Sequence, residues 1–331
     1  MVKRVLTGIK STGQPHLGNY LGAMRPAIQM TKKLDQQESY LFIPDYHSLI
    51  SVHDGNELRQ SNYMVAATWI ACGLDPDKTV VYRQSDVPEI FELNWILSCF
   101  TPKGFMNRAH AYKARLQDNE EQGRSDLDTG VSMGLYNYPV LMAADILLFS
   151  ADEVPVGEDQ VQHIEFARDI AQKFNHAYGD ILKLPKPVIS LAKTIPGLDG
   201  RKMSKSYNNH IPVFAPEKKL RKLVMKIKTD SSAPEDPKDP SQSTIFDLFK
   251  EFSSKDEQLD LAKRYETGIG WGEAKQALFE KMNEELAPKR EVYEVTMADI
   301  DALEKVLAAG AEKARVVARK LLGEVRSAIG V

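Results

Sequence analysis

Two stretches of this chain carry residues that could handle a triphosphate. The first runs from Val5 to Tyr20, VLTGIKSTGQPHLGNY, and consists of an apolar strand, a glycine-rich loop and the expected start of a helix. Backbone N–H groups at a helix N-terminus bind anions, and the helix dipole adds positive charge there. His16 and Asn19 are three residues apart, so both can face one side of the first helical turn. We therefore expect this stretch to stabilise charge on a nucleotide triphosphate.

The second stretch lies far along the chain. GRKMSKS, residues 200–206, places Lys202 and Lys205 three residues apart between serines in a glycine-bounded loop. By itself this would be a solvated charged loop, and the glycines of the first stretch match neither a dinucleotide fingerprint nor a P-loop. HLGN near the N-terminus followed by KMSKS, however, resembles the signature pair of the class I aminoacyl-tRNA synthetases.

Length and composition are those of an ordinary globular protein. The 331 residues, 43% hydrophobic and 27% charged, predict two domains and a sizeable core. No apolar run reaches membrane-spanning length, and the start MVKRVLTG lacks a signal-peptide hydrophobic region. Cys72 and Cys99 lie in apolar helical patterns, which favours buried free thiols and a cytoplasmic location. The net charge of −3 does not indicate nucleic-acid binding.

Short apolar or β-branched runs alternate with helical periods in the first half of the chain. Strands are expected at Val2–Thr7, Ser39–Ile43 and Thr79–Arg83, with helices between them at Asn19–Lys33 and Glu57–Cys72. This alternation predicts an α/β fold with a parallel, doubly wound sheet, whose ligands bind at the carboxyl ends of the strands.

Polar triplets follow the second and third strands at Asp45–His47 and Gln84–Asp86, where such a sheet places its functional groups. The polar segment Gln117–Gly130 is expected to be a mobile loop. The remaining expected elements are helices at Pro88–Phe100 and Tyr138–Phe149, a strand at Val154–Val156, a long helix ending near Tyr178, a basic helix at Pro216–Lys228 and four helices between Thr244 and Ile329.

One carboxylate interrupts the apolar helix YPVLMAADILLF. Tyr138, Met142 and Asp145 have the spacing of one helix face. A buried carboxylate must be paired, so Asp145 is either a cap or salt-bridge residue, or an acceptor for a ligand N–H in an apolar pocket. Val154 and Val156 would alternate onto that pocket, and His47 could close it.

The segments YPVLMAADILLF, VPVGEDQ and PGLDGRKMSKS, together with the Asp-x-His after the second strand, resemble the tryptophanyl-tRNA synthetase family in order and spacing. The resemblance implies a Rossmann catalytic domain, residues 1–207 with the KMSKS loop, and an all-α anticodon-binding domain, residues 208–331, whose last helix could pack back on the first domain. It also implies a homodimer that uses ATP, Mg2+, L-tryptophan and the tryptophan tRNA.

By that resemblance, Asp145 accepts the indole N–H, and Tyr138 and Gln160 hold the ammonium group. The ring pocket is lined by Leu6, His47, Met142, Val154 and Val156. His16 and Asn19 stabilise the triphosphate, while Lys202 and Lys205 neutralise the departing pyrophosphate. The further residues implied for ATP are Lys10, Gly18, Gly157, Asp159, Met203, Ser204 and Arg115, which stands where many members have a lysine on a mobile loop. Many members carry Gln in place of Lys10.

Because the substrate carboxylate is the nucleophile, neither a protein nucleophile nor a protein metal cluster is needed. The sister family, the tyrosyl-tRNA synthetases, keeps Tyr138 and Asp145 but typically has Gln in place of Met142, and an apolar Met suits an indole better than a phenol. A synthetase-like RNA-binding protein without activation is the other alternative. Such relatives usually lose a signature residue, whereas this chain retains His16 and Asn19 together with both KMSKS lysines.

Overall fold

The computed structural model describes residues 3–11, 13–31, 37–157, 160–189 and 194–331. Its centre is one parallel sheet, formed by β1 (Lys3–Gly8), β2 (Gln37–Ile43), β3 (Val80–Arg83), β4 (Glu153–Val156) and β5 (Lys186–Ile189). The strand order is β3-β2-β1-β4-β5. This order confirms the predicted doubly wound fold and puts its switch point, where ligands bind, between β1 and β4.

Helices occupy most of the remaining chain. Up to β5 they are α1 (Leu17–Asn19), a π-helical turn (Tyr20–Met24), α2 (Arg25–Thr31), α3 (Asp45–Ser48), α4 (Gly55–Ala71), α5 (Glu89–Cys99), α6 (Lys103–Met106), α7 (His110–Glu121), α8 (Met133–Leu147) and α9 (Val161–Tyr178), with a 3₁₀ turn at Gln84–Asp86. After β5 come α10 (Glu217–Met225), a 3₁₀ turn at Pro240–Gln242, α11 (Thr244–Lys250), α12 (Lys255–Thr267), α13 (Trp271–Ala298) and α14 (Ile300–Ile329). None of the described helices is long and apolar enough to cross a membrane.

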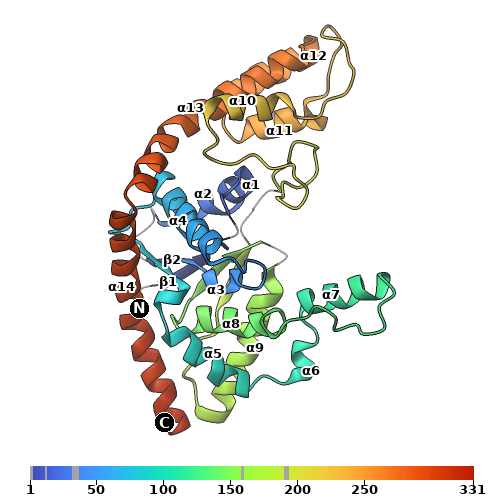
Figure 1. The fold of residues 1–331 in the computed structure, drawn as a ribbon. Coiled ribbons are helices and arrows are strands. Elements are labelled where there is room, and N and C mark those ends of the chain that lie inside the picture. The colour runs from blue at the N-terminus through green and yellow to red at the C-terminus, as the bar shows by residue number, and fades with distance from the viewer. Residues whose placement is uncertain (1–2, 12, 32–36, 158–159, 190–193) are drawn as a thin grey trace.

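Helices cover both faces of the sheet (Figure 1). Leu41 and Ile43 join an apolar cluster with α2, α4 and the helices that follow the KMSKS loop. Tyr40 and Phe42 point to the other face, where they pack with α5, α8, α9 and α14. This alternation is the two-residue period of a strand, and burial on both faces explains why these parallel strands are continuously apolar.

The last helix returns to the edge of the sheet. A Cβ on Gly310 of α14 would lie 1.7 Å from the carbonyl oxygen of Val81 in β3, so only glycine permits this approach. Arg83 at the end of β3 binds Glu304 with two hydrogen bonds of 2.6 and 2.7 Å. In this way α14 covers the edge strand, and Figure 1 shows α13 and α14 running along one side of the molecule.

Some sequence expectations were wrong. The segment Gln117–Gly130 is not a loop throughout, because α7 runs to Glu121. Beyond it the chain is held in a compact turn by Asn119, whose Nδ2 donates to the carbonyl of Leu127 at 2.6 Å. Cys99, expected to be buried, is exposed at the end of α5. Strand β5 was not predicted, because four residues that include a lysine and a proline give little strand signal.

Candidate active site

Asp145 is the centre of a buried polar cluster at the carboxyl end of the sheet. The residue lies on α8 and is fully buried. Its Oδ1 accepts a hydrogen bond from Gln84 Nε2 at 2.7 Å, and its Oδ2 lies 2.9 Å from His47 Nε2. Gln84 lies in the 3₁₀ turn after β3 and His47 lies in α3 after β2, so three separate segments meet at one carboxylate. Gln84 was not predicted as a binding residue, although its place directly after a strand was the available signal.

The hydrogen bonds around Asp145 leave part of its acceptor capacity unused. Burial raises the pKa of this carboxyl group, and the hydrogen bonds from His47 and Gln84 oppose that rise. Two carboxylate oxygens offer about four acceptor positions, so two donors leave capacity for another. The bonds from His47 and Gln84 therefore orient the group and leave acceptor capacity for a third donor.

Tyr138 and Met142 precede Asp145 on α8, at the predicted spacing of one helix face. The Tyr138 hydroxyl lies 2.5 Å from Nε2 of His163 on α9, and its ring meets the His47 ring edge-on with centroids 6.2 Å apart. His163 is a site residue that sequence reasoning missed. It occupies a buried position in the apolar pattern of a long amphipathic helix, and nothing in that pattern separates it from a core residue.

The other residues predicted for the ring pocket lie on the same side of the sheet. Leu6 of β1 and Val154 of β4 are buried in the apolar cluster that includes α8. Met142 and Val156 are half-buried and pack against that cluster, and Gln160 immediately precedes α9. Leu6, Met142, Val154 and Val156 thus share one apolar cluster with the helix that carries Asp145.

The turn between β1 and α1 places His16 and Asn19 at a helix start. Asn19 Oδ1 accepts the N–H of His16 at 3.0 Å, and the N–H of Asn19 donates to the His16 carbonyl at 2.8 Å. A Cβ on Gly18 would lie 2.9 Å from the His16 ring, so the absence of a side chain keeps this surface open. A π-helical turn follows at once, a feature that is frequent at functional sites.

The KMSKS loop packs directly on this turn. The N–H of Gly18 lies 3.3 Å from Met203 Sδ, a contact across 185 residues of sequence. The N–H of Leu17 donates to the carbonyl of Ile211 at 2.9 Å. Lys205 Nζ lies beside the glycine-rich loop, where a Cβ on Gly13 would approach it to 3.3 Å. The two stretches singled out in the sequence therefore form one surface.

His16 is neutral at physiological pH. Burial lowers its pKa to about 4, with further contributions from the charges of Lys205 and His210. Its imidazole can thus act as a hydrogen-bond donor without carrying charge, while the cationic lysine supplies the positive field.

Asn209, which sequence reasoning also missed, fixes the shape of the KMSKS loop. Its Oδ1 accepts the N–H of Ser204 at 2.8 Å, and its Nδ2 donates to Asp199 Oδ1 at 2.7 Å and to the Lys202 carbonyl at 3.1 Å. A Cβ on Gly197 would lie 2.4 Å from this side chain, so the loop closes tightly around it. An amide just outside the recognised motif thus determines the motif's conformation.

The other residues predicted to bind the nucleotide make fewer contacts with the turn that carries His16 and Asn19. Lys10 and Lys202 are exposed, and Gly157 follows β4 at the switch point. Arg115 is exposed on α7, which projects from the body of the molecule (Figure 1), and none of the described residues joins it to the site by a hydrogen bond or ion pair. Asp159 lies outside the described residues.

The two halves of the site are linked. The buried hydroxyls of Ser11, after β1, and Ser48, beside His47, lie 3.0 Å apart. The turn at the start of α1, with its lysine loop, is therefore connected to the polar cluster around Asp145. Such an arrangement can hold a nucleotide and a second, partly apolar substrate in fixed relative positions.

Comparisons with known proteins agree with this geometry. The family model described as tRNA synthetases class I (W and Y) matches residues 2–287. The chain is 54% identical over 330 residues to the tryptophan–tRNA ligase of Neisseria meningitidis serogroup A, covering 99% of this chain and 98% of that relative. It is 53% identical over 334 residues to the corresponding ligase of Xanthomonas axonopodis pv. citri, covering 100% of this chain and 77% of the relative. A crystal structure of tryptophanyl-tRNA synthetase from Campylobacter jejuni, complexed with ADP and tryptophan, matches with a TM-score of 0.89 at 43% identity, covering 99% of this chain and 100% of that one.

Proposed function

This chain belongs to the class I tRNA synthetases for tryptophan and tyrosine, and from that membership and its geometry we propose how its residues divide the work. Its activity is that of a tryptophan–tRNA ligase, which joins L-tryptophan to ATP as tryptophanyl-adenylate and then transfers tryptophan to its tRNA. The observation that carries the residue assignment is the buried Asp145, oriented by His47 and Gln84 with acceptor capacity to spare.

In the proposed pocket, Asp145 accepts the indole N–H. The ring packs among Leu6, Met142, Val154 and Val156, with His47 at one side. Tyr138 and Gln160 contact the ammonium group of the amino acid. Met142 favours an indole because its apolar side chain offers no hydrogen bond to a phenol hydroxyl.

In the proposed nucleotide site, the triphosphate lies on the turn that carries His16 and Asn19. Gly18 has no side chain, so the adenine can pack closely against its backbone. Asp159 accepts hydrogen bonds from the ribose hydroxyls. Lys202 and Lys205 approach the phosphates from the opposite side. The other residues proposed to contact ATP, from the family resemblance, are Lys10, Gly157, Met203, Ser204 and Arg115.

The reaction joins these two sites. A carboxylate oxygen of tryptophan attacks the α-phosphorus, and the bond from that phosphorus to the bridging oxygen of pyrophosphate breaks. Negative charge therefore grows on the leaving pyrophosphate, where His16, Asn19 and the two KMSKS lysines stabilise it. The rest of the acceleration comes from holding both substrates in line, so no protein nucleophile takes part.

Magnesium is proposed to enter on the nucleotide. Among the described residues, no group of three histidine, cysteine or carboxylate side chains could hold a metal ion. The described side chains beside the triphosphate position are neutral or cationic, namely His16, Asn19 and Lys205, which are poor partners for Mg2+. Magnesium bound through phosphate oxygens and water fits this donor set, since Mg2+ prefers oxygen ligands and retains its waters.

ATP–pyrophosphate exchange with tryptophan, tyrosine and phenylalanine tests the assignment. We expect exchange with tryptophan and much weaker exchange with tyrosine, whose hydroxyl cannot take the place of an indole N–H at Asp145. Stronger exchange with tyrosine would identify the sister specificity. Retained tRNA binding without any exchange would identify an RNA-binding protein that has lost activation.

A homodimer is proposed through an apolar surface on α3 and α5. Trp95 is 72% exposed, and Phe91 one turn earlier contacts Tyr46 with ring centroids 4.4 Å apart. Leu49, directly after α3, is also exposed. Adjoining exposed apolar side chains mark association surfaces. Trp95→Glu should shift sedimentation to a monomer, whereas Val316→Glu, at a similarly exposed position of α14, should not; an unaltered Trp95→Glu dimer would contradict the assignment.

The tRNA is proposed to run from the KMSKS loop over α10 and the helices beyond it. The basic residues of α10 would contact phosphates of the tRNA, and such contacts contribute most of the affinity but no sequence information. Residues 1–207 would then be the catalytic domain and residues 208–331 the anticodon-binding one, although both apolar clusters combine residues from each side of that boundary. Free thiols at Cys72 and Cys99 agree with a cytoplasmic location.

A further inference from the structure

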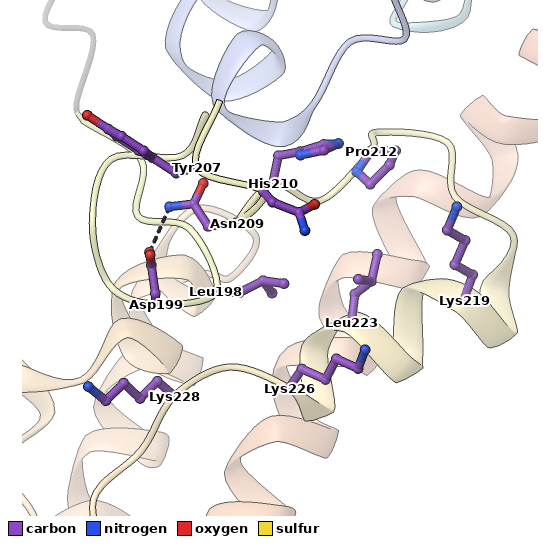
Figure 2. A pocket seen from close by; sticks show the side chains of 11 residues that line it. Leu198, Asp199, Tyr207, Asn209, His210, Pro212, Lys219, Leu223, Lys226 and Lys228 are labelled. Atoms are coloured by element: carbon purple, nitrogen blue, oxygen red, sulfur yellow. Dashed lines mark hydrogen bonds between the residues drawn. The ribbon is translucent and has the colours of Figure 1, made fainter. Parts of the chain in front are cut away.

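A cavity of about 570 Å³ lies between the KMSKS loop and α10. Figure 2 shows its two walls: the loop contributes Tyr207, Asn209 and His210, and the basic helix with the residues after it contributes Lys219, Lys226 and Lys228. Leu198 and Leu223 supply apolar surface between them. The volume is that of a small-molecule site rather than of a packing defect.

The cavity carries positive charge that nothing in the described part of the chain neutralises. The ammonium groups of Lys219, Lys226 and Lys228 form neither an ion pair nor a hydrogen bond with any described residue. Asp199 is the lining carboxylate, and it already binds Arg201 and Asn209. Three uncompensated cations around one concave space attract an anion.

The pKa of His210 is also affected by this positive charge. Burial lowers its pKa, and the charges of Lys205 and Lys219 lower it further. Its Nδ1 has no hydrogen-bond partner among the described residues. A neutral imidazole can donate one N–H to a phosphate oxygen, and lysine ammonium groups bind the same oxygens through charge-assisted hydrogen bonds.

We propose that this cavity is a second phosphate site, separate from the triphosphate turn, and that a phosphate group bound there stabilises the KMSKS loop. Asn209 lines the cavity and also holds Ser204 and the Lys202 carbonyl, so a ligand against it would favour the observed loop conformation. The His210 ring lies 6.0 Å from the His16 ring, so the wall of the cavity adjoins the nucleotide turn. The inference rests on the proposed function only for the loop's part in catalysis.

Two sources could supply the phosphate: a free compound such as pyrophosphate, or the phosphodiester backbone of RNA. The test uses the full chain with tryptophan and α,β-methylene-ATP bound, so that the triphosphate turn is already occupied. Pyrophosphate, and separately tRNA, is titrated while hydrogen exchange is followed over residues 197–213 and 217–228. We expect protection of both segments.

The variant K219Q/K226Q should weaken that response at least about tenfold, because each lysine can form a charge-assisted hydrogen bond to phosphate. K218Q/K222Q is the matched control for pyrophosphate: it removes the same charge from the same helix, but neither lysine lines the cavity. It should change the midpoint by less than about threefold, since exposed charges farther away are screened. For tRNA the control is K313Q/K320Q, at exposed positions of α14.

Protection by pyrophosphate would identify a site for free phosphate compounds. Protection by tRNA alone would identify an RNA backbone site, and the log–log salt slope of K219Q/K226Q should then fall by about 0.7–0.9 per lost contact. No protection by either, or an unaltered response of K219Q/K226Q, would overturn the proposal. Because exchange protection needs no turnover, this result is separate from that of the tryptophan activation assay.

Discussion

Replacing Asp145 with Asn isolates the charge of this carboxylate from its shape. Asn keeps the volume, and its Oδ1 can still accept from Gln84 Nε2, which lies 2.7 Å from the carboxylate. Its Nδ2 would then face His47 Nε2, which can accept when the imidazole proton is on Nδ1. The buried network can therefore survive the substitution, and the loss of negative charge is the main change.

The magnitude follows from the type of hydrogen bond. A bond to a charged group contributes about 1.5–3 kcal/mol and a neutral bond about 0.5–1.5 kcal/mol. Asp145→Asn should therefore cost about 1–1.5 kcal/mol, or roughly 5- to 12-fold in kcat/KM for tryptophan. Asp145→Ala removes the acceptor altogether and should cost roughly 10- to 200-fold.

The stability of the Asp145→Asn variant should not fall along with its activity. Burial raises the folded-state pKa of Asp145 above its ordinary value of 3.8. The unfolded chain therefore loses this proton first, and wild-type stability falls as the pH rises from 3.8 through the raised folded pKa. Asp145→Asn lacks this penalty, so at neutral pH its melting temperature should not fall, whereas Asp145→Ala should be destabilised by the cavity and the unpaired Gln84 amide.

The assay is ATP–pyrophosphate exchange at varied tryptophan concentration, with thermal melting of each variant measured in parallel. Reduced exchange by Asp145→Asn with an unchanged or higher melting temperature would support a role in binding the substrate. If Asp145→Asn exchanges tryptophan within about twofold of the unaltered protein, below the loss calculated for a missing charge, then Asp145 is structural and the pocket assignment is wrong.

Further perturbations test other parts of the molecule. His16 should titrate near pH 4 when followed by NMR, and Lys205→Gln should raise that pKa. Because the folded-state pKa lies below 6.5, the free energy of unfolding should decrease as the pH falls from 6.5. Titration near 6.5 would contradict a buried neutral imidazole. Gly310→Ala should lower the free energy of unfolding by about 1–3 kcal/mol or more, because the added Cβ would overlap β3. Denaturant unfolding measures this change. Hydrogen exchange over residues 197–209 should slow when ATP and a tryptophan analogue bind; unchanged exchange would argue against loop closure. Aminoacylation should weaken, and its log–log salt slope should fall by about 0.7–0.9 per lost contact, when three lysines in α10 and directly after it are replaced with Gln; an unaltered slope would make them a solvated face. Those residues are Lys218, Lys222 and Lys226.

Much of this architecture follows from local sequence. Alternating apolar runs and helical periods predict the parallel sheet, because each element's periodicity reflects the face that it buries. The two signature motifs are contiguous, so their recognition requires no knowledge of the fold. Asp145 also stands out locally, since one carboxylate on an apolar helix face needs a partner. Neither the partner nor its position is part of that local signal.

The long-range contacts of the candidate site could not be read from the sequence. Gln84 and His47 reach Asp145 across 61 and 98 residues, and Met203 reaches Gly18 across 185. These contacts depend on strand order and register, which place distant loops at one edge of the sheet. The same holds for α14, whose glycine meets the edge strand β3. Periodicity shows that a face will be buried, but packing geometry selects the surface that covers it.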